Sequence, residues 1–289
     1  MKNTIPFLFL LFGSISFSQN NPDIFLFDLA PANEGLELLN MRNISNNTGY
    51  DNQPSFQTDN LILFAGNNNG QTDIAQYNIE YKSVSWYNIL TEGGEYSPQK
   101  FPSLNDVAAV RLDPDGLQRL YKYNFNAGKS SILIPDLQIA YFTFYDDNRI
   151  LASVLSNDKL DLVLIDLQKK TNDTLLKNVG RCIQKIPKSN SMSYTVINQD
   201  KNLDLYIWDI ISKESFFVCE LPQGVQDYIW LNDTQILLGS GNNLYRYDTL
   251  GDSEWEKMAS LEPFKISSPT RMAISPNGKH LAIVSVVTE

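Results

Sequence analysis

Histidine and cysteine are almost absent from this sequence of 289 residues, which contains one histidine and two cysteines. A single imidazole nearly excludes a histidine-rich metal site and a catalytic triad built on histidine. Two thiols exclude a four-cysteine zinc site and a scaffold held together by many disulfides. We therefore expect no metal, no cofactor and no catalytic residue, in a protein that is not an enzyme.

Basic residues and long apolar runs are also scarce. The 23 lysines and arginines are outnumbered by 33 aspartates and glutamates, so the formal net charge is −10. Phosphate backbones are bound by clustered basic residues, so this balance argues against a nucleic-acid partner. No apolar run approaches 18 residues, and we expect no membrane span. Aromatic residues make up 11% of the chain and charged residues only 19%, a combination that favours β structure.

Residues 1–18 have the pattern of a secretory signal peptide. Lys2 gives a positive start, the apolar run IPFLFLLF occupies residues 5–12, and small serines precede a cleavage point after Ser18. The apolar run is too short to span a bilayer. The alternative is a buried N-terminal strand, but polar residues follow at once. We therefore expect an exported chain, periplasmic or extracellular, whose mature part is one domain over residues 19–289.

Two short strand patterns each recur six times. The first has a turn-forming residue at its sixth position: Asp28, Asn78, Asn124, Asp166, Asp209 and Asp248. The second is an apolar strand whose copies start 42 to 46 residues apart, at positions 61, 107, 149, 192, 235 and 280. Four strands per unit and a period near 44 residues are typical of a β-propeller blade. The sequence therefore predicts an all-β fold, a six-bladed β-propeller of four-stranded antiparallel blades. Six copies in register argue against the alternative, an irregular sandwich.

The two ends of the chain predict how the ring closes. Residues 267–289 contain inner strands and no outer ones, whereas the first recurring strand, from Asp23, has no inner strands before it. We expect strands from residues 23–42 to pair with the C-terminal blade, because an unclosed ring would expose strand edges. The Asp or Asn at the sixth position is interpreted as a cap of the following turn, not as part of a ring of carboxylates.

Part of the repeat also resembles a known family. Residues 50–80 contain Pro-Ser-Phe, an apolar strand, a glycine-containing hairpin and Asp-Ile, and residues 275–285 contain a Ser-Pro-Asn-Gly turn. The matching positions are Pro54, Ser55, Phe56, Gly66, Gly70, Asp73, Ile74, Ser275, Pro276 and Gly278. These features are similar to the TolB-like, WD-related propeller repeat, although residues 57–60 depart from its usual turn. The resemblance implies a six-bladed propeller that serves as a binding platform in the cell envelope.

Three groups of residues that suggest chemistry have simpler structural interpretations. Cys182 and Cys219 fall in the innermost and outermost strands of one blade, about 14 Å apart by strand spacing, which is too far for a disulfide. We expect two unpaired, mostly buried thiols. Asp113 and Asp115 are interpreted as an ordinary DPDG turn, since a calcium loop would need further ligands. His280 opens a strand and is interpreted as an exposed or packed residue rather than a general base.

Loops that enter the innermost strands should gather around one mouth of the central channel. They carry aromatic and polar residues on a rigid scaffold, which suits recognition of a peptide, a protein or a glycan. The candidate binding residues are Tyr50, Asp51, Glu95, Tyr96, Gln226, Asp227 and Tyr228. The alternative is that these residues merely pack the starts of the blades.

We therefore expect an exported, monomeric, non-catalytic propeller that binds an envelope protein or peptide at the channel mouth. The alternative is a carbohydrate-active enzyme, a glycosidase or lyase that uses acidic residues in the channel. A third possibility is a structural module without a small ligand. Paired acids of raised pKa in a deep channel would favour the enzyme, whereas a shallow mouth with exposed aromatic residues would favour binding.

Overall fold

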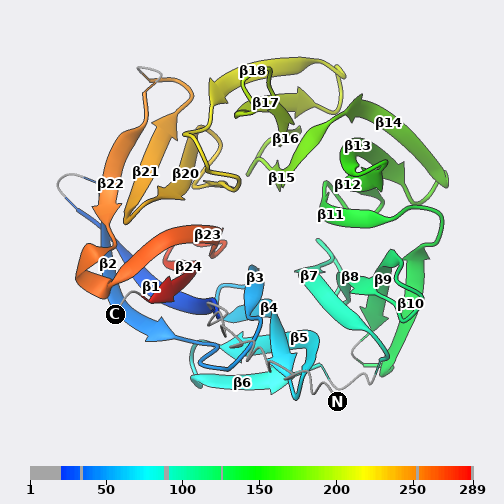
Figure 1. Cartoon of the computed structure of the whole chain (residues 1–289), viewed down its shortest axis with the longest axis horizontal. Coiled ribbons are helices and arrows are strands. Elements are labelled where there is room, and N and C mark those ends of the chain that lie inside the picture. Colours follow the sequence, from blue (N-terminus) through cyan, green and yellow to red (C-terminus); the bar gives the residue numbers. More distant parts are fainter. Residues whose placement is uncertain (1–20, 33–34, 88–90, 125, 252–253, 288–289) are drawn as a thin grey trace, which may run out of the picture.

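The computed structural model describes residues 21–32, 35–87, 91–124, 126–251 and 254–287. The predicted signal peptide, residues 1–18, lies outside the described residues. Six four-stranded antiparallel sheets stand around a central axis as the blades of a propeller (Figure 1). The predicted all-β, six-bladed architecture is confirmed.

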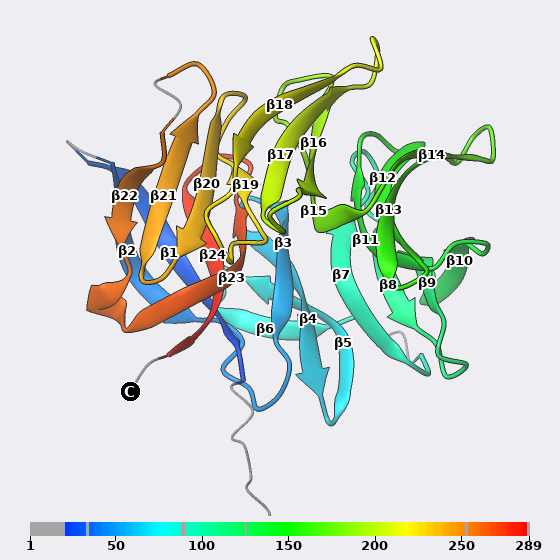
Figure 2. The same cartoon turned by 45° about the horizontal axis from the view of Figure 1, so that its top comes forward.

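Each blade runs from an innermost strand beside the axis to an outermost strand on the rim, where β10, β14, β18 and β22 lie (Figures 1 and 2). Blade 1 contains β3 (Asn52–Thr58), β4 (Leu61–Asn68), β5 (Gln71–Asn78) and β6 (Ser83–Trp86). Blade 2 contains β7 (Gly94–Lys100), β8 (Val107–Leu112), β9 (Gln118–Asn124) and β10 (Lys129–Ile134). Blade 3 contains β11 (Ile139–Phe144), β12 (Arg149–Ser156), β13 (Lys159–Asp166) and β14 (Thr171–Lys177).

The second half of the ring repeats this arrangement. Blade 4 contains β15 (Val179–Lys185), β16 (Ser191–Ile197), β17 (Leu203–Asp209) and β18 (Ser215–Glu220). Blade 5 contains β19 (Ile229–Trp230), β20 (Gln235–Ser240), β21 (Asn243–Asp248) and β22 (Glu256–Ser260). A 3-10 turn, η1 (Glu262–Phe264), leads into blade 6, which contains β23 (Ile266–Ile274), β24 (His280–Val287), β1 (Asp23–Pro31) and β2 (Leu36–Asn43).

The apolar core lies in the seams between neighbouring blades. The second strand of a blade is covered on both faces, so it forms a continuous apolar run instead of an alternating one. In β4, Ile62, Leu63 and Phe64 are at most 1% exposed. Each seam holds buried side chains from two adjacent blades, as in the cluster that joins Leu120 of blade 2 and Phe142 of blade 3. Packing of blade on blade therefore holds the innermost strands at fixed positions around the axis.

Blade 6 is built from both ends of the described chain. Strand β1 pairs antiparallel with β24, with Asp23 opposite Ser285 and Asp28 opposite His280. The N-terminal strands thus complete the C-terminal sheet and close the ring, as predicted (Figure 1). Closure gives β24 a hydrogen-bonded neighbour on each side and leaves neither edge of this inner strand open.

The turn-forming residues at the sixth position cap their turns, with one exception. A side-chain oxygen accepts a backbone N–H bond of 2.7 to 3.0 Å at Asn78, Asn124, Asp166, Asp209 and Asp248. Asp28 instead accepts from Arg42 and lies 3.0 Å from Nδ1 of His280. Because β1 continues past Asp28 to Pro31, no turn follows it. His280 is half-buried and has a structural partner in this carboxylate.

The remaining structural interpretations also agree with the described chain. Cys182 and Cys219 are buried and unpaired, as predicted. The DPDG sequence forms a turn, in which the Gly116 N–H donates to the Asp113 carbonyl at 2.9 Å. Asp113 also forms ion pairs with Arg111 and Arg119. Within the described ranges, no helix is long and apolar enough to cross a membrane, and no group of three or more His, Cys, Asp or Glu is placed to hold a metal ion.

Candidate binding site

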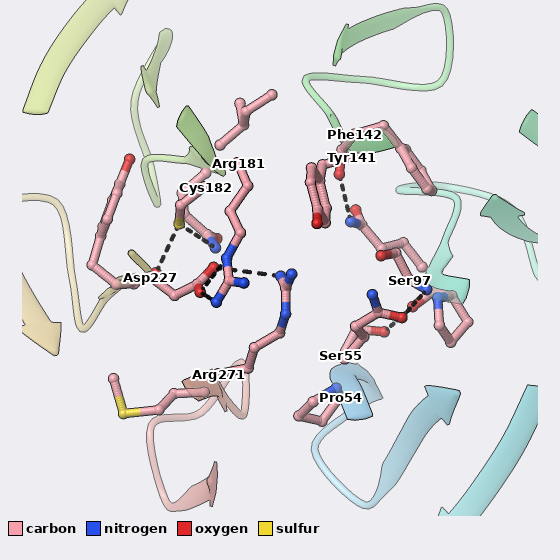
Figure 3. A pocket seen from close by; sticks show the side chains of 16 residues that line it. Pro54, Ser55, Ser97, Tyr141, Phe142, Arg181, Cys182, Asp227 and Arg271 are labelled. Atoms are coloured by element: carbon pink, nitrogen blue, oxygen red, sulfur yellow. Dashed lines mark hydrogen bonds and ion pairs between the residues drawn. The ribbon is translucent and has the colours of Figure 1, made fainter. Parts of the chain in front are cut away.

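The innermost strands surround a narrow channel along the axis, which we call the throat. It is a cavity of about 90 Å³ lined by β3, β7, β11, β15, β23 and the segment before β19 (Figure 3). Three wider cavities, of about 400, 480 and 620 Å³, lie around it. All four cavities share Arg181. We call the three wider cavities the mouth, and together with the throat they form a funnel.

Bulges in the innermost strands shape the throat. The pairing of the innermost strand with the second strand slips by one residue in β3, β7 and β11 and by two in β15 and β23. A bulge bends a strand and re-aims its side chains. Gln53, Ser97 and Ser268 lie in these bulges with φ of 57°, 50° and 52°. Left-handed backbone is uncommon for residues other than glycine, and it gathers at functional sites.

One half of the throat is charged. Asp227 precedes β19, and its Oδ2 accepts from Nε of Arg181 at 2.7 Å and from Nη2 of the same guanidinium. Nη1 of Arg271 lies 3.4 Å from the other carboxylate oxygen. Arg181 also donates to the Thr270 carbonyl at 3.2 Å. Figure 3 shows the two arginines approaching one carboxylate from β15 and from β23. We call Arg181, Asp227 and Arg271 the triad. Two positive charges and one negative charge give the triad a net charge of one positive unit.

The other half of the throat is polar and uncharged, and its side chains connect neighbouring innermost strands. Oε1 of Gln53 accepts from the Ser97 N–H at 2.8 Å, which links β3 to β7. Nε2 of Gln99 donates to the Phe142 carbonyl at 2.7 Å, which links β7 to β11. The Ser55 hydroxyl donates to a carbonyl of β7. These groups are used to hold the blades together around the axis.

Aromatic rings lie beside the arginines at the mouth. Tyr50 is 37% exposed and lines the 480 Å³ cavity together with Tyr141, Arg181 and Arg271. Tyr50 and Tyr96 meet edge to face, with ring centroids 5.8 Å apart. The Arg271 guanidinium lies 5.1 Å from the centroid of the Tyr141 ring, within cation–π distance. The mouth therefore combines positive charge with aromatic surface.

Four of the seven candidate residues from the sequence lie at or beside the mouth. Tyr50 faces it and Tyr96 packs on Tyr50. Gln226 is exposed and lines two of the wider cavities, and Asp227 lies between the arginines. The structure brings these four residues to one face of the ring.

The other three candidates have side chains buried in the seams. Asp51 is fully buried, its Oδ1 accepts from the Asn67 N–H at 3.2 Å, and burial raises its pKa to about 6. Glu95 is 3% exposed, and burial raises its pKa to about 7. Tyr228 borders the throat, but its side chain is 1% exposed, and its hydroxyl donates to Ser193 at 2.8 Å. These three side chains contribute to blade packing.

Arg181, Arg271 and Tyr141 are the residues that sequence reasoning missed. All three stand on innermost strands, where the neighbouring blades present serine and glutamine to the throat. The sequence did contain one signal for these residues: the innermost strands carry arginines although the chain as a whole is acidic. The bulges that aim these side chains inward leave no trace in the sequence pattern.

Comparisons with known proteins show the fold. No family model matches the sequence, and no curated protein matches it. Among solved structures, a putative TolB from Agrobacterium tumefaciens is similar at a TM-score of 0.69 and 10% identity, over 93% of this chain and 99% of that chain. A gluconolactonase from Xanthomonas campestris is similar at 0.63 and 7% identity, over 93% and 96% of the two chains. An oligogalacturonate lyase in complex with manganese is similar at 0.59 and 10% identity, over 88% and 83%. The chain is thus a TolB-like six-bladed β-propeller in fold, an architecture shared by proteins of different function.

Proposed function

We propose that this chain is an exported, non-catalytic propeller that binds a segment of a protein or peptide partner at the channel mouth. The observation that carries the proposal is the funnel itself: aromatic rings at the rim and two arginines where the mouth narrows to the throat. Aromatic and arginine side chains in a concave site are the residues that dominate binding energy in interfaces. The signal-peptide pattern at residues 1–18 supports a site of action outside the cytoplasm.

The acidic residues around the funnel favour binding over hydrolysis of a glycosidic bond. A glycosidase needs two carboxyl groups about 5–10 Å apart, one of them with a raised pKa. Of the described residues that line the four cavities, Asp227 and Asp158 are the acidic ones, and Asp227 is paired with two arginines. The carboxyls of raised pKa, Asp51 and Glu95, are buried in the seams and line none of these four cavities.

The proposal is tested with immobilised protein, residues 19–289, incubated with an envelope extract. The wild type is compared with a Tyr50→Ala, Tyr141→Ala variant, which removes two rings from the mouth. Tyr81→Ala is the matched control, because Tyr81 is 74% exposed in the turn between β5 and β6. Tyr228 is not substituted, since loss of a buried ring costs about 3–5 kcal/mol of stability.

The expected result is one partner that the wild type and Tyr81→Ala retain and the mouth variant loses, followed by titration of that purified partner. A partner retained equally by all three proteins would contradict the proposed face. Cleavage products from polysaccharides incubated with the wild type would favour the enzymatic alternative and overturn the non-catalytic proposal.

A further inference from the structure

We propose that Arg181 and Arg271 form a subsite for one carboxylate of the bound partner segment. This inference rests on the proposed function and names the chemistry that the mouth selects. The segment is an extended peptide, and the carboxylate is either its C-terminus or an Asp or Glu side chain. The observations that carry the inference are the donors that the arginines have left over, the charge around them and the width of the throat.

The two guanidinium groups have more donors than their protein partners use. Each guanidinium has five N–H donors in a planar fork. Arg181 uses Nε and Nη2 on Asp227 and Thr270, and Arg271 uses Nη1 on Asp227. No hydrogen bond joins Nε or Nη2 of Arg271 to another described residue, and neither atom is buried and unsatisfied. Arg271 therefore keeps free donors for an acceptor that enters from the mouth. A carboxylate is the acceptor that matches the planar guanidinium fork.

Charge around the funnel favours an anionic group. The described residues lining the four cavities include four basic ones, Lys159, Arg181, Lys201 and Arg271, against the two acidic ones, Asp158 and Asp227. The whole chain has the opposite sign, with a formal charge of −10. A cleft lined by one sign of charge focuses the field and attracts the opposite charge. The mouth is thus a positive region of an acidic protein.

The volume of the throat limits which part of a ligand can enter it. Its volume of about 90 Å³ is smaller than the ~150 Å³ of a cavity that holds benzene. A carboxylate with one or two methylene groups fits, whereas a sugar ring is larger than benzene and does not. The wider cavities of the mouth have room for the residues on either side in a peptide. These dimensions fit a peptide that places a carboxylate in the throat, whereas a uronic acid would have to keep its ring in the mouth.

Asp227 makes the inference testable, because it occupies the position of a competing carboxylate. If the triad only joins blades 4, 5 and 6, Asp227→Asn destabilises the propeller and does not raise its affinity for an acidic peptide. If the arginines form a carboxylate subsite, Asp227→Asn frees donors and raises the local charge by one unit, so affinity for an acidic peptide rises. Arg271→Gln has the opposite effect, and it leaves Arg181 in place to hold Asp227.

The experiment uses three randomised hexapeptide pools on immobilised protein, with retained peptides quantified by mass spectrometry. The first pool has a free C-terminus and no Asp or Glu, the second is the same pool with a C-terminal amide, and the third is amidated with one Asp or Glu. The proteins are wild type, Arg271→Gln, Arg271→Lys, Asp227→Asn and the control Arg149→Gln. Arg149 begins β12, pairs with Asp146 and lines none of the four cavities.

We expect the wild type and Arg149→Gln to retain one carboxylate pool at least tenfold better than the amide pool, a difference of about 1.4 kcal/mol. Arg271→Gln should abolish that preference, Arg271→Lys should keep part of it, and Asp227→Asn should increase it. Which of the two carboxylate pools is retained identifies the source of the carboxylate.

Two other results would overturn the inference and are distinguishable. Retention of all pools without preference, unchanged in Arg271→Gln, would refute the carboxylate subsite and leave the proposed function standing. Retention of no pool, together with binding of oligogalacturonate as a fourth probe that is unchanged in Arg271→Gln, would refute the subsite and the peptide partner together.

Discussion

Replacement of Glu95 by glutamine should remove much of the change in protein stability between about pH 5 and pH 8. Glu95 is 3% exposed in the seam between blades 1 and 2. Its Oε1 accepts from the Tyr123 hydroxyl at 3.2 Å and from the hydroxyl of Thr91, and Asp73 faces the same carboxyl. Burial first, and then the neighbouring Asp73 charge, raise the pKa of Glu95 from 4.5 to about 7.

The direction of the effect follows from which state holds the proton more tightly. The folded protein keeps a proton on Glu95 up to about pH 7, whereas the unfolded chain releases it near pH 4.5. Stability from this group is therefore fully present below about pH 4.5 and is lost as the pH rises through about 7. The gap between the two pKa values corresponds to about 3 kcal/mol, of which about 2.5 kcal/mol falls between pH 5 and pH 8.

Glutamine resembles the protonated acid, because it keeps an acceptor for Tyr123 and gains a donor for Asp73. Urea unfolding should therefore give nearly equal stabilities for wild type and Glu95→Gln near pH 5, with the variant about 2.5 kcal/mol more stable near pH 8. The matched control is Glu92→Gln, three residues earlier and exposed. Asp51, whose pKa burial raises to about 6, adds a slope of the same sign in all three proteins. Parallel profiles for wild type and Glu95→Gln would refute the reasoning.

Two further predictions concern the thiols and the seams. Burial raises the pKa of Cys182 and of Cys219 to about 12. Iodoacetamide near pH 8 should therefore leave both thiols unmodified in the folded protein and alkylate both in guanidinium chloride. Rapid labelling of the folded protein would contradict the buried placement of these thiols. Phe27 is fully buried and meets Phe264 edge to face at 5.0 Å, so Phe27→Ala should lower the free energy of unfolding by about 3–5 kcal/mol. Phe216→Ala, at a ring 53% exposed on β18, should cost far less, and equal losses in the two variants would argue against the packing of Phe27 in the seam between blades 5 and 6.

Much of the fold was predictable from the sequence because it depends on local patterns. Short strands alternate with turns, and the same apolar strand recurs every 42 to 46 residues. This repeat determines six sheets of four strands. The strands near Asp23 lack partners in their own part of the chain, which determines that they pair with the C-terminal blade. The unpaired state of Cys182 and Cys219 follows from the same frame, since sheet spacing keeps the first and last strands of a blade apart.

The candidate site depended on tertiary structure. Asp227 lies 46 residues from Arg181 and 44 from Arg271, one blade in each direction. The repeat places these residues in adjacent blades, but only the packed ring brings their side chains to one point beside the axis.

The tertiary structure also decided the direction in which each side chain points. Side chains alternate along a strand, so one extra residue exchanges the two faces. Tyr50 faces the mouth while Asp51 is buried, and Asp227 lies between the arginines while Tyr228 is buried. The sequence by itself determined the strands, their order and the closure of the ring, because these follow from periodicity. The tertiary structure decided that Arg181 and Arg271 reach the channel, because bulges of two residues in β15 and β23 set which side chains of these strands face it.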